Sequence, residues 1–330
     1  MTQKKLINGM RRRWILLLIP AIVVAAVVII MTPWNISNLS SLPHPAQSYT
    51  EAVQRVEILR AQEPPDMAPV CHLKFMTHDK KADRAIILVH GYTNCPQQFY
   101  ELGQHFYELG YNVLIAPLPQ HGLADRMTEA HAHLKAEELA AYADETVDIA
   151  QGLGGEVIMM GLSAGGVATA WAAQHRSDID VAVIISPAFG FKKIPTLLTA
   201  AAMNIHKYIP NSFGWWDPVL QADRPPPYAY PRYSTQALRQ ILRLGFATQA
   251  DAKRMQPAAK KMVVVFNVHD NSINNALTMD IVEIWKAHNA NLITYEFDAN
   301  LTVGHDLIDP TQPDQQIDIV YPLLIDLVKR

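Results

Sequence analysis

One stretch constrains the fold of this chain more than any other. Over residues 156–175, a short apolar run leads into Gly-Leu-Ser-Ala-Gly, and an Ala-rich segment without proline follows. The apolar run is typical of a buried strand, and the Ala-rich segment favours a helix. A serine between such a strand and helix sits on a sharp turn that can present its hydroxyl as a nucleophile. The pattern predicts this role for Ser163, with a purely structural Gly-Ser turn as the alternative.

Strand and helix patterns alternate along most of the chain. Candidate strands cover residues 71–77, 85–89, 112–116, 156–160, 181–186, 262–267 and 291–297. Candidate helices cover residues 48–63, 96–109, 136–152, 164–175 and 274–288. The central strands are apolar on both faces, as expected of strands covered by helices on both sides. This alternation predicts an α/β fold with a mostly parallel central sheet.

One connection is much longer than the others. Residues 188 to about 258 separate two core strands and are rich in proline and aromatic residues. Connections of this length are usually functional. We expect a helical cap insertion over the site.

The N-terminal region carries a long apolar run. Residues 14–31 contain no charge, five Lys or Arg residues precede them, and Glu51 is the first charge that follows. As a helix the run would reach about 27 Å, close to the hydrocarbon thickness of a bilayer. The charge asymmetry predicts a signal anchor with residues 1–13 in the cytoplasm and the rest outside. A cleaved signal peptide and a buried core helix are the alternatives.

These boundaries divide the chain into four parts. After the cytoplasmic residues 1–13 and the transmembrane helix 14–31, residues 32–69 read as a linker with a short helix. Residues 70–330 form the predicted catalytic domain.

Composition excludes some classes of partner. The net charge is −3 with mixed signs, which does not suggest nucleic-acid binding. The two cysteines, Cys71 and Cys95, could pair outside the cytoplasm or remain buried thiols. With no second cysteine pair, we expect no metal site. We also expect no cofactor. The sequence leaves the oligomeric state open.

A serine nucleophile needs a base, and the base needs an acid that orients it. In the strand–turn–helix arrangement these follow the serine in the order acid, then histidine. Asp270 lies just after the strand at 262–267, and His305 lies in a late loop behind a glycine. Asp298 and Asp306 are the rival acids. The order Ser163, Asp270, His305 is the predicted catalytic triad.

The reaction also needs donors for a developing oxyanion. The first predicted donor is the backbone amide of Ala164, directly after the serine. The second is the amide of Tyr92, which follows His90-Gly91 at the end of an early strand. A plain strand-end turn is the alternative for this segment.

These motifs together resemble the α/β-hydrolase superfamily. The likeness is greatest to bacterial carboxylesterases and monoacylglycerol lipases. It rests on four motifs: His90-Gly91-Tyr92-Thr93, Gly161-Leu162-Ser163-Ala164-Gly165, Asp270, and Gly304-His305-Asp306. Pro117-Leu-Pro-Gln-His-Gly122 is similar to Leu-Pro-Gly-His-Gly of that branch, with Gln120 in place of a glycine. The resemblance implies hydrolysis of an acyl ester through an acyl-enzyme, in a domain covering about residues 70–330.

The resemblance also implies that the insertion covers an acyl pocket. Four aromatic residues there are candidates to line a lipid-like site, or they simply pack the cap onto the core: Trp215, Trp216, Tyr228 and Tyr230. The expected protein is a membrane-anchored serine esterase or lipase that acts outside the cytoplasm. A peptidase, a thioesterase, a carbon–carbon bond hydrolase and a catalytically silent binding module remain alternatives.

Overall fold

The central sheet has seven strands. The structure, a computed structural model, describes residues 19–37 and 39–329. The strand order is β1-β3-β2-β4-β5-β8-β9, and every pair is parallel except β1 with β3. The bounds are Lys74–Met76 (β1), Ala82–Val89 (β2), Asn112–Ile115 (β3), Gly154–Leu162 (β4), Val181–Ile185 (β5), Met262–Phe266 (β8) and Leu292–Glu296 (β9). Each predicted strand overlaps one of these, so the α/β fold with a mostly parallel sheet is confirmed.

Alternating side chains give the sheet two apolar faces. In β2, Ala85, Ile87 and Val89 belong to one buried cluster, while Ile86 and Leu88 belong to the other. This follows from the two-residue period of a strand. Strands that bury both faces must be covered by helices on both sides.

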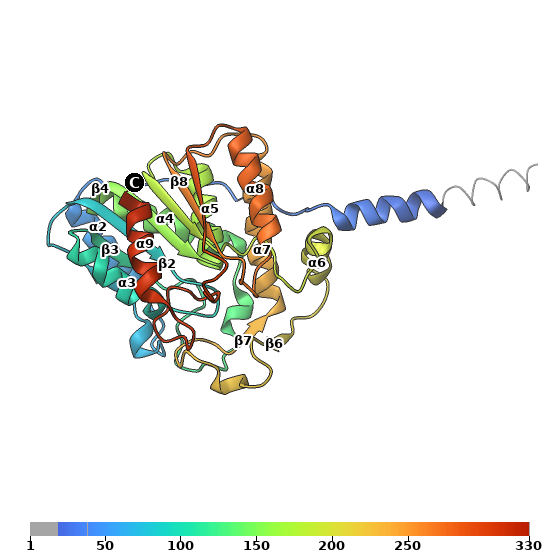
Figure 1. Cartoon of the computed structure of the whole chain (residues 1–330), viewed down its shortest axis with the longest axis horizontal. Coiled ribbons are helices and arrows are strands. Elements are labelled where there is room, and N and C mark those ends of the chain that lie inside the picture. The colour runs from blue at the N-terminus through green and yellow to red at the C-terminus, as the bar shows by residue number, and fades with distance from the viewer. Residues whose placement is uncertain (1–18, 38, 330) are drawn as a thin grey trace, which may run out of the picture.

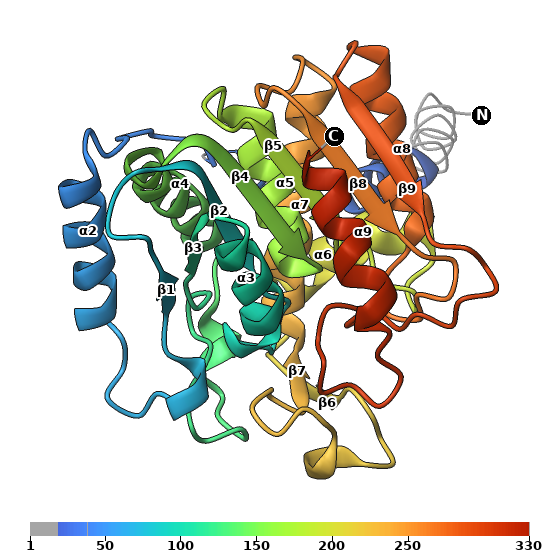
Figure 2. The same cartoon turned by 60° about the vertical axis from the view of Figure 1, so that its left-hand side comes forward.

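The helices lie in two layers (Figure 2). Helices α3 (Gln97–Glu108) and α9 (Ile317–Lys329) cover one face. Helices α4 (Ala136–Leu153), α5 (Ala164–His175), α7 (Thr235–Ala252) and α8 (Asn275–Ala287) cover the other, and α2 (Tyr49–Ala61) packs against α4. Helix α9 is not among the predicted elements. It contains Pro322, which disfavours a helix interior, but its apolar side is buried on the sheet.

The long insertion between β5 and β8 has two different parts. Its first part carries helix α6 (Thr199–His206) and the antiparallel strands β6 (Phe213–Trp215) and β7 (Arg232–Ser234). Its second part is α7, whose buried Ile241 and Leu244 join the core of the domain. The part of the insertion that lies outside the core of the domain therefore ends where α7 begins.

Residues 19–31 form a helix that projects away from the domain (Figure 1). Its apolar side chains are exposed, among them Ile22 and Val24. Within the described residues, no helix is both long enough and apolar enough to cross a membrane. Residues 14–18, which begin the predicted span, lie outside the described residues.

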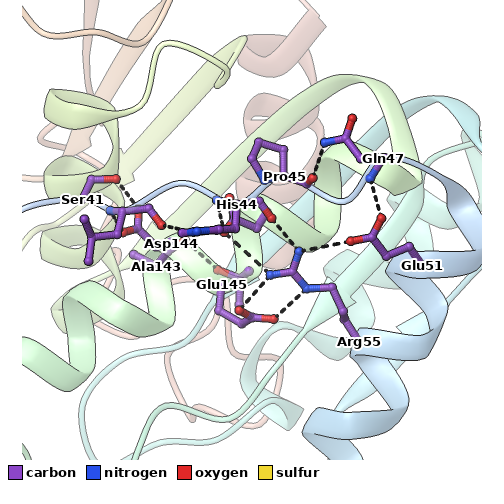
Figure 3. A network of polar contacts seen from close by, with 12 residues as sticks. Ser41, His44, Pro45, Gln47, Glu51, Arg55, Ala143, Asp144 and Glu145 are labelled. Atoms are coloured by element: carbon purple, nitrogen blue, oxygen red, sulfur yellow. Dashed lines mark hydrogen bonds and ion pairs between the residues drawn. The ribbon is translucent and has the colours of Figure 1, made fainter.

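The segment predicted as a linker runs along α4 (Figure 3). Asp144 of α4 accepts hydrogen bonds from the Ser41 hydroxyl at 2.5 Å and the Leu42 amide at 2.7 Å. Asp148 accepts one from the His44 amide at 2.8 Å. Residues 41–44 are thus held by carboxylates of the domain.

Candidate active site

Ser163 occupies a strained turn between β4 and α5. Its φ is +58° and its ψ is −113°, in the left-handed half of backbone space that non-glycine residues seldom adopt. The glycines on either side permit the turn. A Cβ on Gly161 would lie 2.2 Å from the carbonyl oxygen of Gly165, and one on Gly165 would lie 2.2 Å from that of Val89. Strain of this kind often marks functional positions.

Asp270 and His305 form a direct hydrogen bond. The Nδ1–H of His305 donates to Oδ2 of Asp270 at 2.7 Å. The other carboxylate oxygen of Asp270 accepts the backbone amides of Ser272 at 2.9 Å and Ile273 at 3.0 Å. The acid is therefore held from both sides. Because Nδ1 carries the proton, Nε2 of His305 is free to accept one.

The contact between Asp270 and His305 lowers the pKa of the carboxyl group and raises the pKa of the imidazole. Burial alone would raise the pKa of Asp270, but the charge and hydrogen bond of His305 and the two amides hold it below its usual value. Burial would likewise lower the pKa of His305, but Asp270 outweighs that effect and raises it. A base with a raised pKa takes a proton from a serine more readily.

The two rival acids bond elsewhere. Asp298 is exposed and accepts the amide of Asn300 at 2.8 Å. Asp306 accepts the Gln98 side-chain amide at 3.0 Å and forms an ion pair with Arg224 at 3.4 Å. Of the three carboxylates, Asp270 is the one bonded to the His305 ring.

Two backbone amides beside Ser163 have no acceptor among residues 19–37 and 39–329. Ala164 is the first residue of α5, so its N–H has no partner within the helix. In the turn after β2, the amides of Gly91, Thr93 and Asn94 donate to Gln98, His121 and Gly91 respectively. Within the described part of the chain, the amide of Tyr92 is left without an acceptor. Tyr92 and Ser163 line the same narrow pocket.

Two buried histidines hold the turn after β2 in place. Nε2 of His90 accepts the amide of Leu118 at 2.9 Å, and Nε2 of His121 accepts the amide of Thr93 at 3.0 Å. Burial, helped by the neighbouring His121, lowers the pKa of His90 to about 3. Burial lowers the pKa of His121 to about 4. Both rings are therefore neutral at physiological pH and act as fixed acceptors.

A disulfide bond joins Cys71 to Cys95 at the end of the same turn. The bond ties the segment before β1 to the start of α3, with a sequence separation of 24 residues. Tyr228 packs against this disulfide in a small buried cluster. The turn that carries Tyr92 is thus braced by hydrogen bonds and by a covalent link.

A larger cavity opens beside the narrow pocket that holds Ser163. The narrow pocket, of about 40 Å³, is lined by Ser163 and His305. The neighbouring cavity has a volume of about 480 Å³, within the range of small-molecule sites. Four residues line both spaces: Phe191, Trp216, Leu238 and Ser272. The two spaces therefore adjoin, and an apolar chain in the larger one would start near Ser163.

The four aromatic residues predicted for the pocket separate in the structure. Trp216 lines both spaces, and its Nε1–H donates to the Thr93 hydroxyl at 2.9 Å. Trp215 lies in β6 near Arg232, outside both linings. Tyr228 is buried on the disulfide and donates to Asp309 at 2.8 Å. The Tyr230 hydroxyl accepts the amide of Leu123 at 2.9 Å, so these two tyrosines brace the cap.

Gln98 is a residue of the candidate active site that the sequence analysis missed. Its side chain is fully buried. Its carbonyl oxygen accepts the Gly91 amide at 2.8 Å, and its amide donates to Asp306 at 3.0 Å. It therefore connects the turn that carries Tyr92 to the loop that carries His305. A helical glutamine has no sequence signal that announces such a role.

The described residues contain no group of three or more His, Cys, Asp or Glu side chains that could hold a metal ion.

Comparison with known proteins identifies the family. A family model described as "Serine aminopeptidase, S33" matches residues 80–297, which include Ser163 and Asp270. The chain belongs to this S33 family. His305 falls just beyond the matched range, in the next loop.

A curated protein with a similar sequence is a lipase. A thermostable monoacylglycerol lipase of Bacillus sp. (strain H-257) is 27% identical over 176 residues, which cover 52% of this chain and 65% of that protein. The chain thus matches somewhat less than two thirds of the relative's length.

Solved structures share the fold at low sequence identity. The monoacylglycerol lipase of Paleococcus ferrophilus has a TM-score of 0.55 and 18% identity over 74% of this chain and 93% of that one. A soluble variant of the Saccharomyces cerevisiae monoglyceride lipase has a TM-score of 0.58 and 13% identity over 78% and 90%. Together with the family match, these neighbours confirm an α/β-hydrolase fold.

Proposed function

We propose that this S33 protein is a serine esterase that cleaves acyl esters with Ser163, Asp270 and His305. One observation carries the proposal: Ser163 stands on a strained turn in the same narrow pocket as His305, which is hydrogen-bonded to a buried carboxylate. Two unpaired backbone amides, of Tyr92 and Ala164, border the same serine. A nucleophile, a base, an acid and oxyanion donors are the parts that acyl transfer requires.

The proposed reaction proceeds in two steps. His305 takes the proton of the Ser163 hydroxyl as its oxygen attacks the ester carbonyl carbon, and the amides of Tyr92 and Ala164 stabilise the oxyanion. His305 then gives the proton to the departing alcohol, which leaves an acyl-enzyme. Water, deprotonated by His305, attacks the acyl carbon; the bond to Ser163 breaks, His305 returns the proton to the Ser163 oxygen, and the acid is released. Asp270 keeps its charge and stabilises the imidazolium in both steps.

The cavity favours an apolar ester over a peptide with a free amino terminus. Its lining contains several apolar side chains, among them Ile194, Met203 and Leu242, and no carboxylate. The acidic residue of the catalytic pocket, Asp306, is already bonded to Gln98 and Arg224. An ammonium group bound in this site would lack a free anion to pair with. We therefore place acyl esters before the aminopeptidase substrates suggested by the family's name.

The proposal includes a membrane anchor at residues 14–31, with the domain outside the cytoplasm. The uncharged run, the basic residues before it and the exposed apolar helix at residues 19–31 support it. An alkaline phosphatase fused after residue 45 tests this orientation, because the enzyme matures only after export. A well-expressed but inactive fusion would reverse the topology.

A fluorophosphonate tests the catalytic part without a guess about the substrate. The full-length chain in detergent is treated with the reagent and analysed by intact mass and peptide mapping. We expect one adduct on Ser163, formed as its oxygen displaces fluoride from phosphorus, and no adduct in His305→Ala. A folded protein that does not react would instead favour a binding module without catalysis.

A further inference from the structure

One face of the cap exposes apolar side chains. This cap face consists of helix α6 and its flanking loops, and its exposed apolar residues are Leu197, Leu198, Ile205, Tyr208 and Ile209. Leu197 is 81% exposed and Tyr208 is 73% exposed. Clustered apolar exposure of this kind marks a contact with a partner or a membrane.

The charge of the cap face has one sign. Residues 181–216 contain no Asp or Glu, but they contain Lys192, Lys193 and Lys207. All three lysines are exposed. An apolar surface bordered by lysines matches the chemistry of anionic lipid headgroups above an acyl layer.

The cap face is joined to the root of the projecting helix. The buried Asn204 of α6 donates from Nδ2 to the carbonyl oxygens of Ile30 and Thr32, each at 2.8 Å. Trp34 lies 6.0 Å from the Tyr208 ring, and the Lys207 ammonium lies 4.6 Å from the Trp34 ring. Figure 1 shows α6 beside the point where helix 19–31 leaves the domain. The cap face and the end of the apolar run are therefore neighbours.

The same helix borders the acyl cavity. Ala202, Met203 and His206 of α6 line the cavity of about 480 Å³, while Ile205 and Tyr208, on and just after the helix, are exposed. Thus α6 separates the cavity from the surface beside the apolar run. Trp34 and Tyr208 are the residue types that concentrate where a membrane span meets water.

From this arrangement we propose that the cap face rests on the lipid bilayer that holds residues 14–31, so that the ester substrate enters the cavity from the membrane. This inference rests on the proposed esterase function and on the proposed anchor. The partner is the lipid surface itself. The contacts of Asn204 hold α6 at the level where the apolar run ends.

Depth measurements test the contact. The full-length chain, carrying Leu197→Cys or Tyr208→Cys labelled with a fluorophore, is reconstituted into phosphatidylcholine–phosphatidylglycerol vesicles. Spin-labelled lipids in those vesicles should quench both positions. Ile58→Cys, an exposed apolar position on α2 that is 55% exposed, serves as the matched control and should stay unquenched. Equal quenching at all three positions, or none at 197 and 208, would overturn the proposal.

Activity on two substrates separates the docking from the catalysis. Leu197→Asp and Tyr208→Asp should each lower hydrolysis of a long-chain ester embedded in vesicles about ten-fold, the size expected for losing one buried apolar side chain. Both should hydrolyse a soluble short-chain ester at the unaltered rate, as should Ile58→Asp on either substrate. Unchanged vesicle activity in both cap variants would refute docking. If the unaltered chain hydrolysed neither substrate, the esterase proposal would instead be refuted.

Discussion

His305 is half-buried in the pocket that holds Ser163, and His121 is buried against the turn that carries Tyr92, yet their surroundings drive their pKa values in opposite directions. His305 bonds to the carboxylate of Asp270, which raises its pKa. His121 bonds to the carbonyl oxygen of Pro119 and to the Thr93 amide, and burial lowers its pKa to about 4. Burial disfavours a charged imidazole, and a nearby anion reverses the effect. One histidine can therefore move a proton, and the other can only hold the backbone.

The first and largest expected effect comes from removing the nucleophile or the base. Ser163→Ala and His305→Ala should each reduce kcat on the order of 10⁶-fold, because acyl transfer loses a step it cannot replace. Circular dichroism and thermal unfolding should show both variants folded. Esterase turnover near the original rate in either variant would break the assigned triad.

Removing the acid tests the proton-moving side of the comparison. Asp270→Asn should reduce kcat by about 10⁴-fold, because the amide no longer stabilises the charged His305 ring. Asp298→Asn is the matched control, since Asp298 is exposed and bonds within its own turn. The control should stay within about two-fold of the original rate, as surface changes usually do. A larger loss in Asp298→Asn than in Asp270→Asn would reassign the acid.

Removing the backbone-holding histidine tests the other side. His121→Ala should lower kcat by about 10²-fold with a smaller change in KM, because the turn that presents the Tyr92 amide loses its support at Thr93. His121→Gln keeps an acceptor near the position of Nε2 and should recover part of the loss. If His121→Ala and His121→Gln had the same kcat, the acceptor at Nε2 would not be what supports the oxyanion site.

The smallest expected effect is the dependence on pH. His305 must be neutral to act as a base, so kcat/KM is full above its pKa and falls about ten-fold per pH unit below it. Because Asp270 raises that pKa, and Asp306 adds to the rise against Arg224, the midpoint should lie above the ordinary value of about 6.5. His121, with a pKa of about 4, should add no transition near neutrality.

The His305–Asp270 pair also makes stability depend on pH. A raised histidine pKa contributes stability that is complete below the unfolded pKa of about 6.5 and disappears as pH rises through the folded value. The lowered pKa of Asp270 contributes stability above its unfolded value and loses it as pH falls through the folded one. Unfolding in urea from pH 7 to 9 should therefore show a decline with rising pH that His305→Gln lacks.

The strands and most helices were predictable because their signals are local. Short continuous apolar runs place β2 and β8 without reference to the rest of the chain. The glycines around Ser163 likewise indicate a tight turn from local sequence alone. Helix α9 escaped prediction because Pro322 argues against a helix locally, and only burial against the sheet overcomes it.

The sequence by itself determined the order of the candidate residues along an alternating α/β chain: a serine on a strand–helix turn, then an acid, then a histidine. Tertiary structure decided which groups meet. It brings Asp270 rather than Asp298 to His305, joins Cys71 to Cys95, and puts Trp216 at the cavity while Tyr228 braces the cap. It also sets α6 beside the end of the apolar run. These outcomes depend on contacts between residues far apart in the chain, and the periodicity of single segments carries no information about them.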